Sequence, residues 1–210
     1  MSTNYTMPDL DVIHYGPGEV TFPASDLLSK LTDSLAWRSE TITMFGRTML
    51  QPRLISFYAD AGFEYRYSRK TYTGLAWTPL LSTLREMAEI IAHSPLNSVL
   101  ANLYRDGNDS MGMHADDEPE LGIEPVIVSM SFGATRRFVL KHRSRKDLPA
   151  VEIPLEDSSV LLMRGQTQHH WVHGIKKETR PVGPRVNLTF RRIVVPISGT
   201  HPEVHRAVKP

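Results

Sequence analysis

The chain has 210 residues, a formal net charge of +1 and no cysteine, and this length fits one domain with a core of its own. Hydrophobic residues make up 40% and charged residues 22%, a globular and not a disordered composition. No apolar run approaches the roughly 18 residues of a membrane span, and Met1–Leu10 lacks the features of a secretory signal. The lack of cysteine excludes disulfides, thiolate nucleophiles and cysteine-bound zinc. We therefore expect a cytoplasmic protein, or a nuclear one if the source is eukaryotic, with no membrane partner.

Two helices are predicted in the first half of the chain. Between Ser25 and Trp37, leucines recur at helical spacing. A second helix is expected to begin at Thr78-Pro79, a capping hydroxyl followed by proline at the first helical position, and to end near His93. The intervening segment Thr41–Tyr72 is rich in Tyr, Phe, Arg and Thr and is broken by glycine and proline, which predicts hairpins.

After Pro95 the pattern changes to short β-like runs separated by turn-forming residues. The expected strands are Ser98–Tyr104, Pro125–Phe132, Arg137–Lys141, Val151–Pro154, Val160–Met163, Trp171–Gly174 and Arg185–Pro196. Many short strands in succession favour a sandwich or jelly roll. We predict one α+β, mainly β, domain over residues 1–210. Helices and hairpins would occupy about residues 20–95, and a jelly-roll core (double-stranded β-helix) about residues 96–196.

Charge is unevenly distributed in the predicted core. Arg136–Lys146 holds six Lys or Arg in eleven residues and no acid, whereas Asp116–Glu124 holds five acids and no base. Both segments are compatible with ordinary solvated loops. Alternatively, the basic hairpin contacts phosphates while the acidic segment serves metal or base contact.

His114-Ala115-Asp116 is the sharpest local motif. In an extended backbone, residues two apart point the same way, so this imidazole and this carboxylate can converge on one point. A distal histidine would complete a two-histidine, one-carboxylate triad, which suits non-haem Fe(II) because it leaves positions open for cosubstrate and O₂. His169, His170 and His173 are candidates; if the stretch is one strand, His169 and His173 share a face. A surface loop and packed histidines remain alternative interpretations.

The segment Pro184–Arg192 supplies a possible anion site. Along a strand, four polar residues fall on one face and three apolar residues on the other; the polar four are Arg185, Asn187, Thr189 and Arg191. Two guanidinium groups on an inner face would be costly unless an anion sits there, and a dicarboxylate cosubstrate would fit the planar fork of arginine. An edge strand with its polar face in water is the alternative.

Together these motifs resemble the AlkB family of Fe(II)- and 2-oxoglutarate-dependent nucleic-acid dealkylases. The order His114-x-Asp116, His173, Arg185 and Arg191 is similar to the family's iron and 2-oxoglutarate signature, and its spacing selects His173 as third ligand. The resemblance implies metal ligation by His114, Asp116 and His173, with Arg191 also in the catalytic set. It assigns 2-oxoglutarate contacts to Asn102, Tyr104, Arg185, Asn187, Thr189 and Arg191. Because Asp116 would lie at a loop edge, Asp116→Ala is expected to stop turnover and leave the fold largely intact.

The similarity extends to the duplex-DNA repair branch of that family. Phe45-Gly46-Arg47 resembles the tip of its DNA-contacting hairpin, and Tyr58–Ser68 its base-pocket strand in a nucleotide-recognition lid. The resemblance implies substrate contacts by Phe45, Gly46, Arg47, Tyr65, Arg66, Tyr67 and Asp117. Phe45 would fill the gap left by a flipped base, and Asp117 would accept from an exocyclic amine or favour a cationic lesion.

The implied reaction is oxidative demethylation of 1-methyladenine- and 3-methylcytosine-type bases in DNA, using Fe(II), O₂ and 2-oxoglutarate and releasing formaldehyde, succinate and CO₂. Alkylated DNA is the expected partner and a monomer the expected state. One alternative is a demethylase acting mainly on RNA or single strands. Others are a 2-oxoglutarate hydroxylase of another substrate and a nucleic-acid-binding jelly roll without activity.

Overall fold

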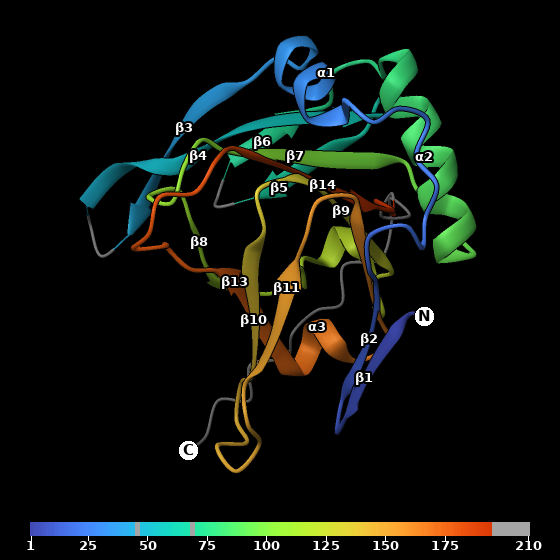
Figure 1. The fold of residues 1–210 in the computed structure, drawn as a ribbon. Helices are drawn as coiled ribbons and strands as arrows, with labels where there is room; N and C mark the ends of the chain where they lie inside the picture. Colours follow the sequence, from blue (N-terminus) through green and yellow to red (C-terminus); the bar gives the residue numbers. More distant parts are fainter. Residues whose placement is uncertain (45–46, 68–69, 195–210) are drawn as a thin grey trace, which may run out of the picture.

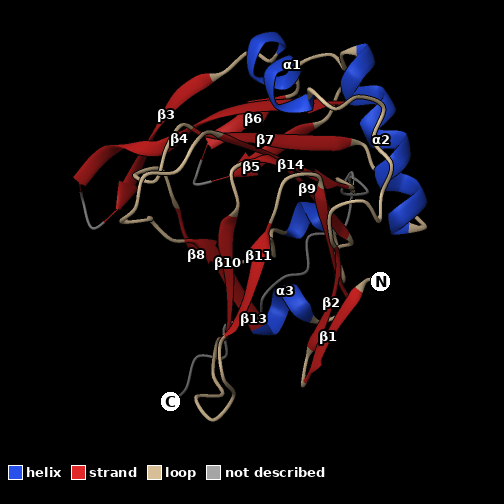
Figure 2. Cartoon of the chain, in the orientation of Figure 1, coloured by secondary structure: helices blue, strands red, loops and turns tan. Residues whose placement is uncertain are grey.

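Two antiparallel sheets form the body of the computed structural model, which describes residues 1–44, 47–67 and 70–194 (Figures 1 and 2). The larger sheet has eight strands, in the order β1 (Thr3–Met7), β2 (Leu10–Tyr15), β12 (Ser159–Arg164), β9 (Ile127–Gly133), β14 (Arg185–Arg191), β7 (Ser98–Tyr104), β4 (Arg47–Ala59) and β3 (Arg38–Met44). The smaller sheet has four, in the order β11 (Val151–Leu155), β10 (Arg136–His142), β13 (Trp171–Ile175) and β8 (Met111–His114). The predicted mainly-β jelly roll is confirmed.

An apolar cluster joins the two sheets. It includes Leu161 and Met163 of β12 and Phe138, Leu140 and Trp171 of the smaller sheet, all buried. Strand β12 contributes to both faces of its sheet, since Leu161 and Met163 belong to this cluster whereas Val160 and Leu162 belong to the one under the helices. Polar residues that interrupt the apolar cluster between the sheets are candidates for function.

Two helices cover the outer face of the larger sheet, as both ribbon views show. Helix α1 (Leu27–Ser34) is shorter than the predicted Ser25–Trp37, whereas α2 (Pro79–Ala92) begins and ends as predicted. Thr78 caps α2 by accepting a hydrogen bond from the Leu81 N–H. Buried leucines of both helices pack against Val186, Leu188 and Phe190 of β14, so one face of β14 lies in a dry core.

The predicted hairpins lie between these helices. Strands β3 and β4 form a long antiparallel pair, and β5 (Glu64–Tyr67) and β6 (Lys70–Thr73) form a separate two-stranded sheet. The β3–β4 pair extends the larger sheet beyond β7 at one end of the molecule (Figure 1). No helix among the described residues is both long and apolar enough to cross a membrane.

The expected strand Trp171–Gly174 is present as β13 (Trp171–Ile175), but several other elements differ from the sequence-based expectations. The hairpin of β1 and β2 and the short strand β8 were not foreseen. The histidine-rich stretch is not one strand, because Thr167–His170 forms the short helix α3 and only Trp171–Ile175 is extended. Strand β14 is not an edge strand, since it pairs with both β7 and β9, and it ends at Arg191. A short 3₁₀ turn, η1 (Pro119–Leu121), interrupts the acidic segment.

Candidate metal and cosubstrate site

Strands β8 and β13 bring two histidines together. His114 is paired with His173 in the antiparallel register, and their rings are 4.4 Å apart between centroids. Gly174 makes this approach possible, because a Cβ at that position would lie 2.8 Å from the Met111 carbonyl oxygen of β8. The register shifts between His173 and Ile175, as at a β-bulge.

Asp116 completes the group just beyond β8. Its side chain is 1% exposed, and its Oδ1 lies 3.8 Å from His114 Nε2. Ligand atoms of His114, Asp116 and His173 all lie within 4.8 Å of one another. Asp116 Oδ1 has no hydrogen-bond partner among the described residues despite being buried, and a cation at this point would satisfy it.

The tautomer of His114 suits metal binding. Its Nδ1 lies 2.9 Å from the Gly112 carbonyl oxygen. A carbonyl only accepts hydrogen bonds, so Nδ1 must carry the proton. The lone pair therefore remains on Nε2, the atom facing Asp116. Such a hydrogen bond from the remote nitrogen is the usual means of orienting a metal-binding histidine.

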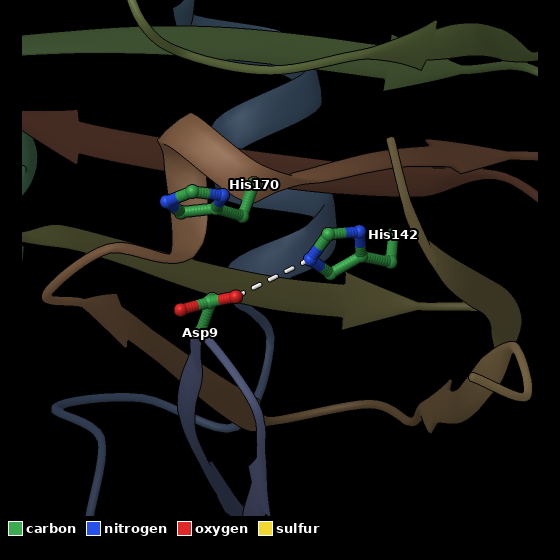
Figure 3. Close-up of side chains that lie close together, drawn as sticks. All are labelled: Asp9, His142 and His170. Carbon is green, nitrogen blue, oxygen red and sulfur yellow. Dashed lines mark hydrogen bonds and ion pairs between the residues drawn. The ribbon is translucent and has the colours of Figure 1, made fainter. Parts of the chain in front are cut away.

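A second group of similar composition consists of Asp9 in the β1–β2 turn, His142 of β10 and His170 of α3 (Figure 3). Here His142 Nδ1 accepts from the backbone N–H groups of Ser144 (3.2 Å) and Arg145 (3.0 Å). The neutral ring must then carry its proton on Nε2, which donates to Asp9 Oδ2 at 3.4 Å. In this tautomer His142 has no lone pair facing the Asp9 carboxylate, so Asp9, His142 and His170 form a hydrogen-bonded contact between elements. The group of His114, Asp116 and His173 is therefore the candidate metal site.

Burial and charge fix the protonation of the triad. Burial alone would raise the pKa of Asp116, but Arg191 and the neighbouring histidines hold it at about 2. Burial, together with the nearby His114, lowers the pKa of His173 to about 3, and burial also lowers the pKa of His114. At neutral pH the site therefore offers one carboxylate and two neutral imidazoles, the forms that bind a metal.

Arg185 lies deeper in the same pocket, where it is 1% exposed. Its Nη2 donates to Ser131 Oγ at 2.9 Å, and its guanidinium lies 5.2 Å from the Tyr104 ring centroid. Its Nε and Nη1 are buried without a hydrogen-bond partner in the described part of the chain. Burial lowers the pKa of Arg185 to about 10, which leaves it cationic at neutral pH. An unsatisfied buried cation of this kind fits a carboxylate ligand.

The remaining polar residues of β14 form a braced network. Asn187 Nδ2 donates to Ser129 Oγ at 2.7 Å, and its Oδ1 accepts from the Thr189 hydroxyl at 3.0 Å. Asn102 Oδ1 accepts from Arg53 Nε at 2.8 Å. Arg191 Nη2 donates to Asp116 Oδ2 at 2.8 Å. In this state Asn187 and Asn102 thus have protein partners of their own.

The residues assigned to metal and cosubstrate meet in one pocket between the sheets. Those lining it are Asn102, Tyr104, His114, Asp116, His173, Arg185, Asn187, Thr189 and Arg191. His169 and His170 lie on α3 and do not line it. Four partners of these residues were not predicted, namely Arg53, Ser129, Ser131 and Gln168. The alternation of Ser129 and Ser131 along the apolar strand β9 is the one signal that could have identified two of them.

The residues assigned to substrate are less fully described. Phe45 and Gly46 lie outside the described residues. Arg47 belongs to β4, and Tyr65, Arg66 and Tyr67 belong to β5; only their backbone is described.

Two predictions about charged residues need correction or qualification. Arg136 was counted in the basic stretch, but it is buried and donates to the carbonyls of Asp106, Asp109 and Lys176. It therefore cannot reach a phosphate. Asp117 is half-exposed and pairs with Arg143 at 2.7 Å, so its carboxylate already has a cationic partner.

Comparisons with known proteins agree with this geometry. The profile of the 2OG-Fe(II) oxygenase superfamily matches residues 23–191. Human alpha-ketoglutarate-dependent dioxygenase alkB homolog 3 is 39% identical over 186 residues, covering 84% of this chain and 64% of that protein. Human DNA oxidative demethylase ALKBH2 is 39% identical over 160 residues, covering 73% of this chain and 61% of that protein.

The chain thus spans less than two thirds of the length of both human relatives, and 67% of bovine alkB homolog 3 at 37% identity. A solved structure described as OsALKBH1 matches with a TM-score of 0.60 at 17% identity, covering 91% of this chain and 100% of that one, which supports the fold. Membership implies Fe(II), 2-oxoglutarate and O₂, as expected from the motifs. The chain belongs to the 2OG-Fe(II) oxygenase superfamily and, within it, to the AlkB homologues.

Proposed function

We propose that this chain demethylates N-alkylated nucleobases of the 1-methyladenine and 3-methylcytosine type in DNA, as a repair enzyme using Fe(II), O₂ and 2-oxoglutarate. The observation that carries the proposal is a single pocket that contains two unsatisfied groups. Among the described residues, Asp116 Oδ1 of the triad has no hydrogen-bond partner, and neither do Nε and Nη1 of the buried Arg185. These are complementary to a metal ion and to a dicarboxylate, respectively. We further propose that the enzyme is a single-domain monomer of the cytoplasm or nucleus.

His114, Asp116 and His173 would hold the iron, and Arg185 the distal carboxylate of 2-oxoglutarate. When bound, iron and 2-oxoglutarate would supply the O₂ activation needed to oxidise the N-methyl group to formaldehyde. Arg191 keeps Asp116 ionised and donates a hydrogen bond to its Oδ2. Tyr104 supports Arg185 through its ring, and Thr189 with Asn187 keeps the wall of the pocket in place.

Charge on one hairpin supports a nucleic-acid substrate. The loop between β10 and β11 extends away from the body of the molecule (Figure 1). Lys141 and Lys146 are exposed there and make no ion pair within the described ranges, whereas Arg143 and Arg145 pair with Asp117 and Asp147. Unpaired lysines on a projecting hairpin are suited to phosphate contact. One relative is named as a DNA oxidative demethylase.

The hairpin of β3 and β4 supports the same substrate class. Leu50 and Met49 of β4 are 63% and 46% exposed. Apolar side chains left in water on a projecting hairpin indicate a surface that meets a partner. On this proposal, Phe45 and Arg47 act beside them, with Tyr65 and Tyr67 stacking on the flipped base and Asp117 near its exocyclic amine. Base flipping is required because a base inside a duplex cannot reach a buried metal.

The decisive experiment measures succinate and formaldehyde release with one lesion placed in single-stranded DNA, duplex DNA and RNA, side by side. Formaldehyde release that is fastest on DNA supports the proposal. Formaldehyde release mainly on RNA would identify RNA as the substrate in place of DNA. Succinate release without formaldehyde on all three nucleic acids would favour a hydroxylase of another substrate. Binding without any turnover would indicate a nucleic-acid-binding protein.

A further inference from the structure

Gln168 joins the two parts of the chain that supply the triad. Its side chain is 0% exposed, although glutamine is a residue seldom fully buried. Its Oε1 accepts a hydrogen bond from the backbone N–H of Asp116 at 3.0 Å. Gln168 belongs to α3, which leads directly into β13 and hence to His173. One amide therefore connects the backbone of one ligand with the turn that carries the other.

Helix α3, which carries Gln168, is anchored by hydrogen bonds to neighbouring strands. Thr167, the neighbouring residue, accepts from the Asp11 N–H at 2.9 Å and donates to the Asp11 carbonyl at 3.2 Å. Its side chain is fully buried. Gln168 Nε2 contacts Met163 Sδ of β12 at 3.6 Å. Helix α3 is thus fixed to β2 and β12 of the larger sheet.

The same turn reaches the far end of the acidic segment Asp116–Glu124. Gln166 Nε2 donates to a carboxylate oxygen of Glu124, and His169 Nε2 contacts the Ile123 carbonyl. Contacts at both ends hold this segment against α3. Of the contacts made by Gln166, Gln168 and His169 with this segment, the one from Gln168 reaches a residue of the triad, namely Asp116.

We infer that Gln168 is a positioning residue that sets the orientation of Asp116 for metal binding, an inference that rests on the proposed role of the triad. Asp116 lies beyond the end of β8, so sheet pairing does not fix its backbone. Its amide is buried, and without the Gln168 oxygen that N–H would have no acceptor. Outer partners of this kind change metal affinity by about 10- to 100-fold when removed.

Mn²⁺ binding to the metal-free protein tests the inference without nucleic acid or turnover. Gln168→Met keeps the length and approximate volume of the side chain but removes the carbonyl acceptor. We expect the Mn²⁺ dissociation constant, measured by calorimetry or by the free Mn²⁺ resonance signal, to rise about tenfold or more. Gln168→Glu retains an acceptor oxygen and adds a negative charge, so it should recover most of the lost affinity.

Gln166→Met is the matched control. It makes the same substitution in the same turn, and it removes a contact to the same acidic segment, but at the exposed end. Its Mn²⁺ dissociation constant should stay at the wild-type value. Equal constants for the two methionine variants, or an unchanged constant in Gln168→Met together with a lower melting temperature, would assign Gln168 a purely structural role.

Amide exchange in the wild-type protein provides a test that does not depend on the variants folding. The Asp116 amide of the metal-free protein should exchange slowly by NMR, because it is bonded to a fully buried oxygen. Exchange as fast as that of an exposed loop amide would overturn the inference. Failure of the wild-type protein to bind Mn²⁺ would instead reject the triad as a metal site, and with it the proposed function.

Discussion

Asp116 uses its two carboxylate oxygens differently, and substitutions can separate their roles. Oδ2 accepts from Arg191, and Oδ1 faces the pocket without a hydrogen bond from the described residues. Asp116 does lie just beyond the end of β8, but the expectation that it adds little to packing was wrong, since its side chain is 1% exposed and pairs with Arg191. Asp116→Ala would remove the carboxylate that forms an ion pair with the buried Arg191.

We therefore expect Asp116→Ala to lose turnover and also about 3–5 kcal/mol of stability, the usual effect of breaking a buried ion pair. Asp116→Asn keeps an oxygen that can accept from Arg191, so it should lose turnover with a smaller loss of stability. Urea unfolding of the metal-free proteins measures the free energy of unfolding, and formaldehyde release measures turnover. A free energy of unfolding equal to that of the wild type in Asp116→Ala would show that the Asp116–Arg191 ion pair does not stabilise the protein.

Arg185 gives a second prediction at the same scale. Arg185→Ala should weaken 2-oxoglutarate binding about ten- to a hundredfold, because hydrogen bonds to charged groups contribute about 1.5–3 kcal/mol. Arg185→Lys keeps the charge but loses the planar fork, and should fall between alanine and wild type. The apparent 2-oxoglutarate constant is the measurement, and oligonucleotide affinity is the control that should not move. An unchanged 2-oxoglutarate constant would mean that the carboxylate binds elsewhere.

At the scale of elements, the β10–β11 hairpin offers a test of the nucleic-acid proposal. Replacing Lys141 and Lys146 with Gln should weaken binding to all sequences and make it less dependent on salt. For each phosphate that the protein no longer neutralises, the slope of log K against log salt becomes shallower by about 0.7–0.9. The control is Lys30→Gln, because Lys30 is an exposed lysine of helix α1, and α1 lies at the opposite end of the molecule from the β10–β11 loop (Figure 1). Equal slopes for the double variant and the wild type would exclude the hairpin from phosphate binding.

Elements with strong local patterns could be predicted, and those that depend on distant partners could not. Thr78-Pro79 and the leucines behind it are local signals, and α2 begins where they indicate. Strand β8 is only four residues long and contains Gly112, so nothing local marks it; it is defined by pairing with β13. His169 and His170 could belong to a strand or a turn by sequence, and the buried Thr167 and Gln168 decide for the turn.

The site shows the same division. The His-x-Asp spacing was enough to place His114 and Asp116 together, since residues two apart along an extended chain share a face, and the family pattern added His173. The partners that orient these residues and their neighbours come from elsewhere in the chain, as with Gln168 on Asp116 and Arg53 on Asn102. Such contacts join residues about fifty positions apart and leave no local pattern in one sequence.

For the whole molecule, bound ligands should act as a brace between the sheets. His114 and His173 belong to the smaller sheet, whereas Arg185 and Arg191 belong to the larger one. Mn²⁺ and 2-oxoglutarate together should therefore raise the melting temperature by more than the sum of their separate shifts. At a hundredfold excess over the dissociation constant the gain is about 2.7 kcal/mol, or about 5–10 °C for a domain of this size.

Thermal unfolding with neither ligand, each ligand and both ligands measures this effect. Asp116→Ala is the control, because its response to Mn²⁺ should be lost while a direct response to 2-oxoglutarate through Arg185 can remain. Shifts that merely add, with no extra gain for the pair, would indicate two independent sites.

The position of β14 in the sheet has a consequence for how the chain is made. It is the last described strand in sequence, yet it lies in the middle of the larger sheet, between β7 and β9. Likewise β2 pairs with β12, with Tyr15 opposite Val160. At about 5–20 residues per second, ribosomal synthesis separates those two strands by roughly 7–30 s. During that interval the early strands have open edges, and the sheet can close only when β14, with Arg185 and Arg191, inserts between its two halves.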